Sequence, residues 1–311
     1  FLFLFSGSVY GDDFQDGLDA YERKDYKTAY KLMLPLAEQG HAIAQFRLGR
    51  MYANEEGVPQ DDKEAFKWFR LSAEQGHAKA QFYMGGSYLN GIGVSKDYKE
   101  AVKWYRLSAE QGHVGGQFNL GTMYDKGQGV PKDYKEAVKW IRLSAEQGHA
   151  KAQNKLGRMY TNGQGVSQDY KEAVKWYRLS AEQGNEYAQY NLGICYAKGE
   201  GVPKDYVSAH MWLNLAASSG DKVAVENRLF LEKQMSPSQI EKAQEMVRNW
   251  KPTNRIRVAE STPPQPSTPQ PPKSKDGAIA TGTGFLFGSQ DYIITNYHVV
   301  KGTSAVKVKF T

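Results

Sequence analysis

Apolar and polar residues follow a helical spacing in two stretches that recur together every 36 residues along most of the chain. In the copy from His77 to Gly112, small and apolar side chains predict a first helix from Ala78 to about Leu89. The segment 90–94 ends this helix, because its two glycines adopt backbone angles that other residues resist. A second helix follows and ends at Gly112. The pattern therefore predicts an array of stacked helical hairpins, not a closed globule.

Two sets of residues mark the repeat. Trp68, Trp104, Trp140, Trp176 and Trp212 lie 36 residues apart, as do Gly40, Gly76, Gly112, Gly148, Gly184 and Gly220. Asp97 and Glu100 have the spacing of a capping box at the start of the second helix, and the pair recurs in other copies. Gly85 stands inside the first helix, where glycine costs about 1 kcal/mol relative to alanine. Its recurrence as Gly49, Gly121, Gly157 and Gly193 predicts that a neighbouring helix approaches closely there.

The residues that define this unit resemble the Sel1-like repeat. They are Ala80, Gly85, Tyr88, Gly91, Gly93, Val94, Asp97, Ala101, Trp104, Tyr105, Ala109 and Gly112. The resemblance covers about residues 14–250 and implies an all-α fold, in which antiparallel helix pairs stack into a right-handed α/α superhelical solenoid akin to tetratricopeptide arrays. It also implies a scaffold that binds protein or peptide ligands and has no chemistry of its own.

The repeat register divides the chain into segments. Residues 1–11 are similar to the end of a signal peptide, with cleavage near Gly11 and a mature chain from about Asp12. Residues 12–40 form an N-terminal half-repeat or cap, and five full copies span 41–76, 77–112, 113–148, 149–184 and 185–220. Residues 221–250 predict capping helices, since Ser236, Pro237 and Gln239 mark a helix start after the period fails. The proline-rich residues 251–276 predict an extended linker.

The net charge of +6 is unevenly distributed. Residues 251–311 contain eight Lys or Arg and three Asp or Glu, a net charge of +5, which leaves +1 for residues 1–250. The mixed signs along the repeats argue against a nucleic-acid-binding surface. No run of 18 apolar residues occurs, so the sequence predicts no membrane span. The apolar start followed by small residues predicts export to a bacterial periplasm or the cell exterior.

Three kinds of residue suggest chemistry, but each has a simpler structural explanation. His41, His77, His113 and His149 recur 36 residues apart. Asn185 and Asp221 take the same register, so the shared role is that of a helix N-cap and not of a metal ligand. Cys195, the only cysteine, replaces a recurring methionine and is expected to fill core space, and the tryptophans are expected between repeats. We predict no metal and no cofactor.

Residues that differ between copies on the first helix are the candidates for partner binding. By analogy with tetratricopeptide arrays, whose inner groove is lined by these helices, one candidate ladder is Phe46, Phe82, Phe118, Asn154 and Tyr190. Its companion, four residues on, is Arg50, Gly86, Thr122, Arg158 and Ile194. Periodicity leaves open whether the aromatic side chains line a groove or are buried between helices. The groove interpretation predicts that alanine at Phe82 and Phe118 abolishes partner capture and preserves the helices.

Beyond the linker the pattern changes from helical to β. The segments GTGFLF at 282–287 and IITNYHVV at 293–300 resemble the opening of a trypsin-like serine peptidase domain of the HtrA-type lineage. The resemblance covers about residues 279–311 and implies that residues 277–311 begin an incomplete β-barrel with His298 as the general base. No G-x-S-G-G stretch occurs in the chain, so the polypeptide as given is expected to be inactive. The alternative is a structural histidine at a strand end.

Two functions from different classes follow. In one, a solenoid recruits substrates or partners to a tethered serine endopeptidase, of which this chain holds only the histidine-bearing start. In the other, the solenoid is a non-catalytic adaptor with a degenerate peptidase tail. An aspartate and a G-[DN]-S-G-G segment beyond Thr311 would favour the enzyme.

Overall fold

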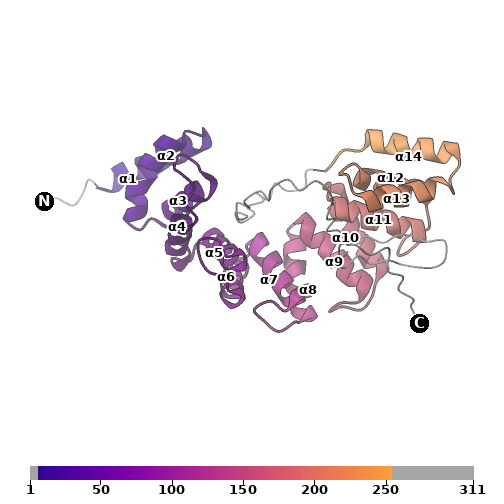
Figure 1. Cartoon of the computed structure of the whole chain (residues 1–311), viewed down its shortest axis with the longest axis horizontal. Helices are drawn as coiled ribbons and strands as arrows, with labels where there is room; N and C mark the ends of the chain where they lie inside the picture. The colour runs from indigo at the N-terminus through magenta and orange to yellow at the C-terminus, as the bar shows by residue number, and fades with distance from the viewer. Residues whose placement is uncertain (1–5, 254–311) are drawn as a thin grey trace, which may run out of the picture. The chain divides into compact units, whose positions relative to one another are not determined.

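A computed structural model describes residues 6–253, and within that range the chain forms fourteen α-helices (Figure 1). Their bounds are α1 (Ser6–Glu22), α2 (Tyr26–Glu38), α3 (Ala42–Asn54), α4 (Asp62–Glu74), α5 (Ala78–Asn90), α6 (Tyr98–Glu110), α7 (Val114–Lys126), α8 (Tyr134–Glu146), α9 (Ala150–Asn162), α10 (Tyr170–Glu182), α11 (Glu186–Lys198), α12 (Tyr206–Ala217), α13 (Lys222–Glu232) and α14 (Pro237–Asn249). The predicted all-α solenoid is confirmed for these residues. The predicted β-barrel fragment, 277–311, and most of the predicted linker lie outside them.

The described helices belong to two compact units, divided between Gln147 and Gly148. In the first unit, helices pair as α1/α2, α3/α4, α5/α6 and α7/α8, and each pair contacts the next through α2 with α3, α4 with α5, and α6 with α7. Residues 12–40, expected as a half-repeat, contain most of α1 and all of α2. Each hairpin therefore has a neighbour against which to bury its apolar face.

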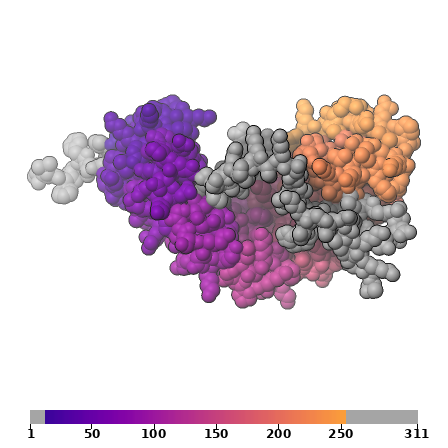
Figure 2. Space-filling view, viewed as in Figure 1, coloured from indigo at the N-terminus to yellow at the C-terminus, as the bar shows by residue number. Residues whose placement is uncertain are grey.

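The second unit consists of α9/α10, α11/α12 and the two helices that follow. Both α13 and α14 pack on α12, and Figure 2 shows this end of the unit, coloured orange, as a closely packed surface. The predicted capping box is confirmed at Ser236 and Gln239, with Pro237 in the first turn of α14. Fully buried His210 on α12 places Nε2 2.8 Å from Glu232 Oε1 on α13. Cys195 is buried in this unit's core, as predicted.

The glycines inside the first helices allow the two helices of a hairpin to approach closely, as the sequence predicts. A Cβ at Gly85 would lie 2.5 Å from Tyr105 Cδ1, and one at Gly121 would lie 2.7 Å from Ile141 Cγ1. Tyr105 is fully buried. The large residue on the second helix thus occupies the space that the missing side chain leaves.

Replacing Gly85 with alanine is therefore expected to destabilise the protein, although alanine is the better helix former. The new methyl group would overlap the Tyr105 ring, and overpacking of this kind costs about 1–3 kcal/mol. Denaturant unfolding checks the change, and addition of Tyr105→Leu should recover part of the loss. Strictly additive effects of the two substitutions would contradict the contact.

The start of each second helix is capped by the predicted aspartate. The second bond of the predicted capping box, from the Asp97 backbone N–H to the Glu100 side chain, is wrong, because that N–H donates to the Tyr88 carbonyl at 3.0 Å. Asp97 Oδ1 accepts hydrogen bonds from the backbone N–H groups of Lys99 and Glu100, at 2.8 and 3.2 Å. The Glu100 carboxylate instead lies 3.4 Å from Lys103 Nζ. The sequence does not distinguish a capping bond of Glu100 from an ion pair with Lys103, because the lysine three residues further on competes for the same carboxylate.

The two loop glycines have different roles. Gly91 takes a left-handed conformation, with φ of 76°, and ends α5. Gly93, with φ of 68°, is in contact with the preceding repeat, because a Cβ there would collide with the Asp62 carbonyl oxygen. The loop therefore both turns the chain and joins one hairpin to the one before it.

Polar side chains also join neighbouring helices, both within a hairpin and between hairpins, at recurring positions. Gln81 on α5 donates to the Ala73 carbonyl of α4 at 3.2 Å, and accepts from Gln111 Nε2 at 2.7 Å. Buried Ser108 donates to the Ala78 carbonyl at 2.8 Å. Since a buried polar group without a partner is costly, these bonds fix the register of neighbouring helices. Trp68, Trp140, Trp176 and Trp212 are buried, as the core interpretation of the tryptophans predicts. Trp104 is partly buried and packs against the core of the first unit.

Candidate partner-binding site

The structure places the predicted partner-binding residues at different depths. Phe46, Phe82 and Tyr190 are buried; Arg50, Phe118 and Asn154 are partly buried; Arg158 is exposed. His298, the predicted general base, lies outside the described residues. Burial between helices, the alternative left open by the sequence, therefore describes Phe82 and Tyr190. Phe46 is buried and also lines a cavity.

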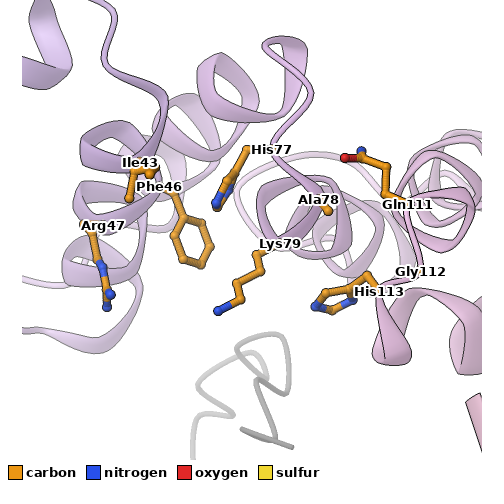
Figure 3. Close-up of a pocket in the computed structure, with 9 residues that line it drawn as sticks. All are labelled: Ile43, Phe46, Arg47, His77, Ala78, Lys79, Gln111, Gly112 and His113. Carbon is orange, nitrogen blue, oxygen red and sulfur yellow. The ribbon is translucent and has the colours of Figure 1, made fainter. Parts of the chain in front are cut away.

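This cavity lies in the first unit and has a volume of about 440 Å³. Its lining consists of Ile43, Phe46 and Arg47 on α3, His77, Ala78 and Lys79 at the start of α5, and Gln111, Gly112 and His113 before α7. Figure 3 shows Lys79 extending into the space between the Phe46 ring and the His113 imidazole. We define these nine residues as the α3–α5 cavity. It opens on the first helices, which the sequence expects to bind partners.

Aromatic packing fixes the floor of the α3–α5 cavity. The centroid of the Phe46 ring lies 4.8 Å from that of His77 and 5.9 Å from that of Phe69, and both interplanar angles are tilted. Such offset contacts hold the ring in one orientation. Ile43 remains 41% exposed beside it. The cavity therefore presents an apolar surface that is partly open to solvent.

The histidines in the lining are helix N-caps, as the sequence predicts. His77 Nδ1 accepts a hydrogen bond from the Ala80 backbone at 3.3 Å, and His113 Nδ1 accepts one from Gly116 at 3.1 Å. Because a backbone N–H can only donate, each Nδ1 must be unprotonated. Asn185 caps α11 in the same register through Oδ1, at 2.9 Å from Ala188 N. The imidazoles are thus neutral groups in a structural role.

The charged residues of the cavity are all cationic. Arg47 lies over the Tyr21 ring, with Cζ 4.9 Å from the centroid, and neighbouring Arg50 lies over the same ring at 5.8 Å. Exposed Lys79 comes from the next hairpin. Within residues 6–253, no carboxylate forms an ion pair with any of these three side chains. The cavity therefore has an uncompensated positive charge.

This charge affects the pKa values of the two imidazoles. Burial lowers the pKa of His77, and the positive charges of Lys79 and Arg47 lower it further. Burial lowers the pKa of His113 to about 4, with a further contribution from Lys79 and His77. In both cases the charged neighbours disfavour a second cation. Both imidazoles therefore stay neutral at pH 7 although the cavity is positive.

Sequence reasoning missed Ile43, Arg47 and Lys79. The signal was present, because the position of Ile43 is taken by lysine, glycine, lysine and tyrosine in the later copies. The sequence instead favoured the aromatic ladder that begins at Phe46, three residues after Ile43, as the binding positions. Variation between copies identifies a partner-binding surface only when the varying side chains are also known to be exposed to solvent. The sequence alone does not show which side chains are exposed.

No group of three or more His, Cys, Asp or Glu side chains in residues 6–253 is placed to hold a metal ion. No helix in the same part of the chain is both long enough and apolar enough to cross a membrane.

Helical hairpins of similar length, stacked through recurring contacts, define this as an α/α solenoid repeat protein. The Sel1 repeat family model matches residues 11–41, 42–77, 78–113, 114–149, 150–185 and 186–221. The chain belongs to the Sel1 repeat family. The matched segments end at residue 221, and the comparisons give no support for a trypsin-like peptidase domain.

Solved structures agree with this family. A Sel1 repeat protein from Oxalobacter formigenes is 36% identical, with a TM-score of 0.66 over 75% of this chain and 98% of that one. The protein c5321, a protective antigen in uropathogenic Escherichia coli strains with an SLR fold, is 35% identical, with a TM-score of 0.70 over 77% of this chain.

The chain spans only part of some relatives. It covers 52% of c5321, and it matches 9% of the uncharacterized protein y4bJ of Sinorhizobium fredii, at 44% identity over 59 residues.

Proposed function

We propose that the chain is an exported scaffold that binds protein or peptide segments on the first helices of its repeats. The observation that carries this proposal is the α3–α5 cavity, where exposed Ile43 and Lys79 stand beside a fixed aromatic floor. Ligand sites are typically concave and mostly apolar, with a few polar groups that orient the ligand. The Sel1 repeat family, as a solenoid, is suited to such binding because successive units present a continuous surface.

Partner capture by the immobilised chain tests the proposal, with an extracytoplasmic extract of the source cells as the sample. Ile43→Ser should reduce capture because it removes apolar surface at the cavity. Leu71→Ser, at a residue 37% exposed on α4, makes the same kind of change away from the cavity and should have little effect. Equal effects of both substitutions, or none, would place binding elsewhere.

Export is the second part of the proposal. It is supported by the apolar start of the chain, and it agrees with the description of c5321 as a protective antigen. The expected cleavage point at Gly11 lies within α1, so removal of residues 1–11 would leave the greater part of that helix. Amino-terminal sequencing of the native protein should find a chain that begins near Asp12. A native protein that retains residues 1–11 would contradict export by cleavage.

We further propose that the linker tethers a trypsin-like serine peptidase domain, with His298 as its general base. The support is the GTGFLF and IITNYHVV segments, and a tether would raise the concentration of captured substrates near the peptidase. The native protein should cleave a denatured protein substrate, and His298→Ala should remove that activity while partner capture persists. A gene without the serine motif would instead favour the adaptor.

A further inference from the structure

We propose that the α3–α5 cavity is specific for acidic peptide segments, in which a carboxylate binds between Arg47 and Lys79 and an adjacent apolar side chain packs on Ile43 and Phe46. The inference rests on the proposed scaffold function and names the chemistry of its ligand. A preference for acidic ligands is not expected from the net charge, because residues 1–250 carry a net charge of only +1.

The cavity brings together two cations, Arg47 and Lys79, that are not paired with a carboxylate. On the second helices, some cations contact carboxylates of their own helix, as in Lys67 with Glu64 at 3.2 Å and Arg70 with Glu74 at 2.7 Å. Others, such as Lys63 and Lys99, form no ion pair within residues 6–253 and stand exposed on their helices, away from the cavity lining. Arg47 and Lys79 have no such partner among the described residues. They are therefore available to an external anion without first breaking an internal ion pair.

Arg47 is also held in place for this role. Its guanidinium lies over the Tyr21 ring, and the Tyr21 hydroxyl is itself hydrogen-bonded to the Glu56 carboxylate. The Arg47 Nε atom is buried without a hydrogen-bond partner within residues 6–253. A stacked guanidinium retains its planar donors for a carboxylate, and holding it in advance reduces the entropy lost on binding.

The backbone adds to the positive potential. Helices α5 and α7 begin at the cavity, next to their N-caps His77 and His113, and a helix N-terminus carries a partial positive charge. These two helix N-termini place additional positive potential where a carboxylate would lie.

Size and surroundings favour a peptide over a nucleic acid. The cavity, at about 440 Å³, fits one or two side chains and has the apolar surface of Ile43 and Phe46. A nucleic acid instead needs an extended basic surface along its phosphates.

Fluorescence anisotropy of a labelled peptide of alternating Glu and Leu tests the inference, with a Gln and Leu peptide and a single-stranded DNA of equal charge as comparisons. The full chain should bind the acidic peptide in preference to both. The double variant Arg47→Gln, Lys79→Gln should weaken this binding by about tenfold or more, since each charge-assisted bond contributes at least that much.

The matched control is Lys63→Gln, Lys99→Gln, which removes the same charge from exposed positions on α4 and α6. It should change binding by less than about twofold, as expected for screened surface charges. Equal losses in both double variants would show nonspecific attraction, and preference for DNA would show a polyanion site; either result overturns the inference.

Circular dichroism and denaturant midpoints of both double variants should match those of the parent chain. If the acidic peptide does not bind while Ile43-dependent partner capture persists, this inference fails and the scaffold function stands. If neither is seen, both fail.

Discussion

Replacing Phe82 with alanine is expected to lower the free energy of unfolding by about 3–5 kcal/mol, the range for large-to-small changes at buried aromatic residues. Phe82 is 4% exposed and its ring centroid lies 4.8 Å from that of His113 and 5.9 Å from that of Tyr105. The substitution would therefore open a cavity where α5, α6 and α7 meet. Denaturant unfolding, with amide exchange to locate the loosened helices, measures the effect.

Phe118→Ala is the matched control, because it removes the same side chain from a partly buried position of the same repeat register. Its cost should be clearly smaller. Equal costs at Phe82 and Phe118 would contradict the burial difference. If Phe82 is structural, loss of partner capture in a Phe82 variant does not identify a binding residue, so Ile43 and Lys79 are the better positions to test.

Much of the repeat could be predicted from the sequence because its periodicity reflects packing within one hairpin. Gly85 and Asp97 each have a local physical reason, a close helix approach and a helix cap, and both roles are confirmed. The Glu100 bond was wrong because Lys103 offers a competing partner at similar sequence distance. Local patterns specify which residue types stand together, but not which of two nearby partners is chosen.

The α3–α5 cavity could not be predicted in the same way. Its lining joins residues from three consecutive repeats, and its positive charge depends on Arg47 and Lys79 lacking internal partners. Net charge hides this feature, because the acidic residues of α1 offset the cations of the first helices in any sum over the chain. A nearly neutral chain can therefore contain a locally basic site, and only the positions of the side chains in the structure show it.

Acidification from about pH 6.5 to about pH 4 is expected to destabilise the first unit through His113. Its pKa is about 4 in the folded chain, because burial and the nearby Lys79 and His77 disfavour the imidazolium, against an ordinary value of 6.5. Between these values the unfolded chain binds a proton that the folded chain does not, so stability falls as the pH falls. The contribution of the neutral His113 imidazole to the free energy of unfolding is fully present above pH 6.5 and is lost by about pH 4. The total loss from this group is up to roughly 3 kcal/mol.

His113→Asn separates this effect from the titration of other groups. Asparagine does not titrate, and it can keep the cap, as Asn185 does for α11 through a 2.9 Å bond to Ala188 N. The variant should therefore show a flatter dependence of unfolding free energy on pH across this window, while carboxylates and His77 titrate in both proteins. Denaturant unfolding at half-unit pH steps measures the difference between the two curves. Parallel curves would mean that His113 keeps an ordinary pKa and that Gly116 N–H does not depend on a neutral imidazole for its hydrogen bond.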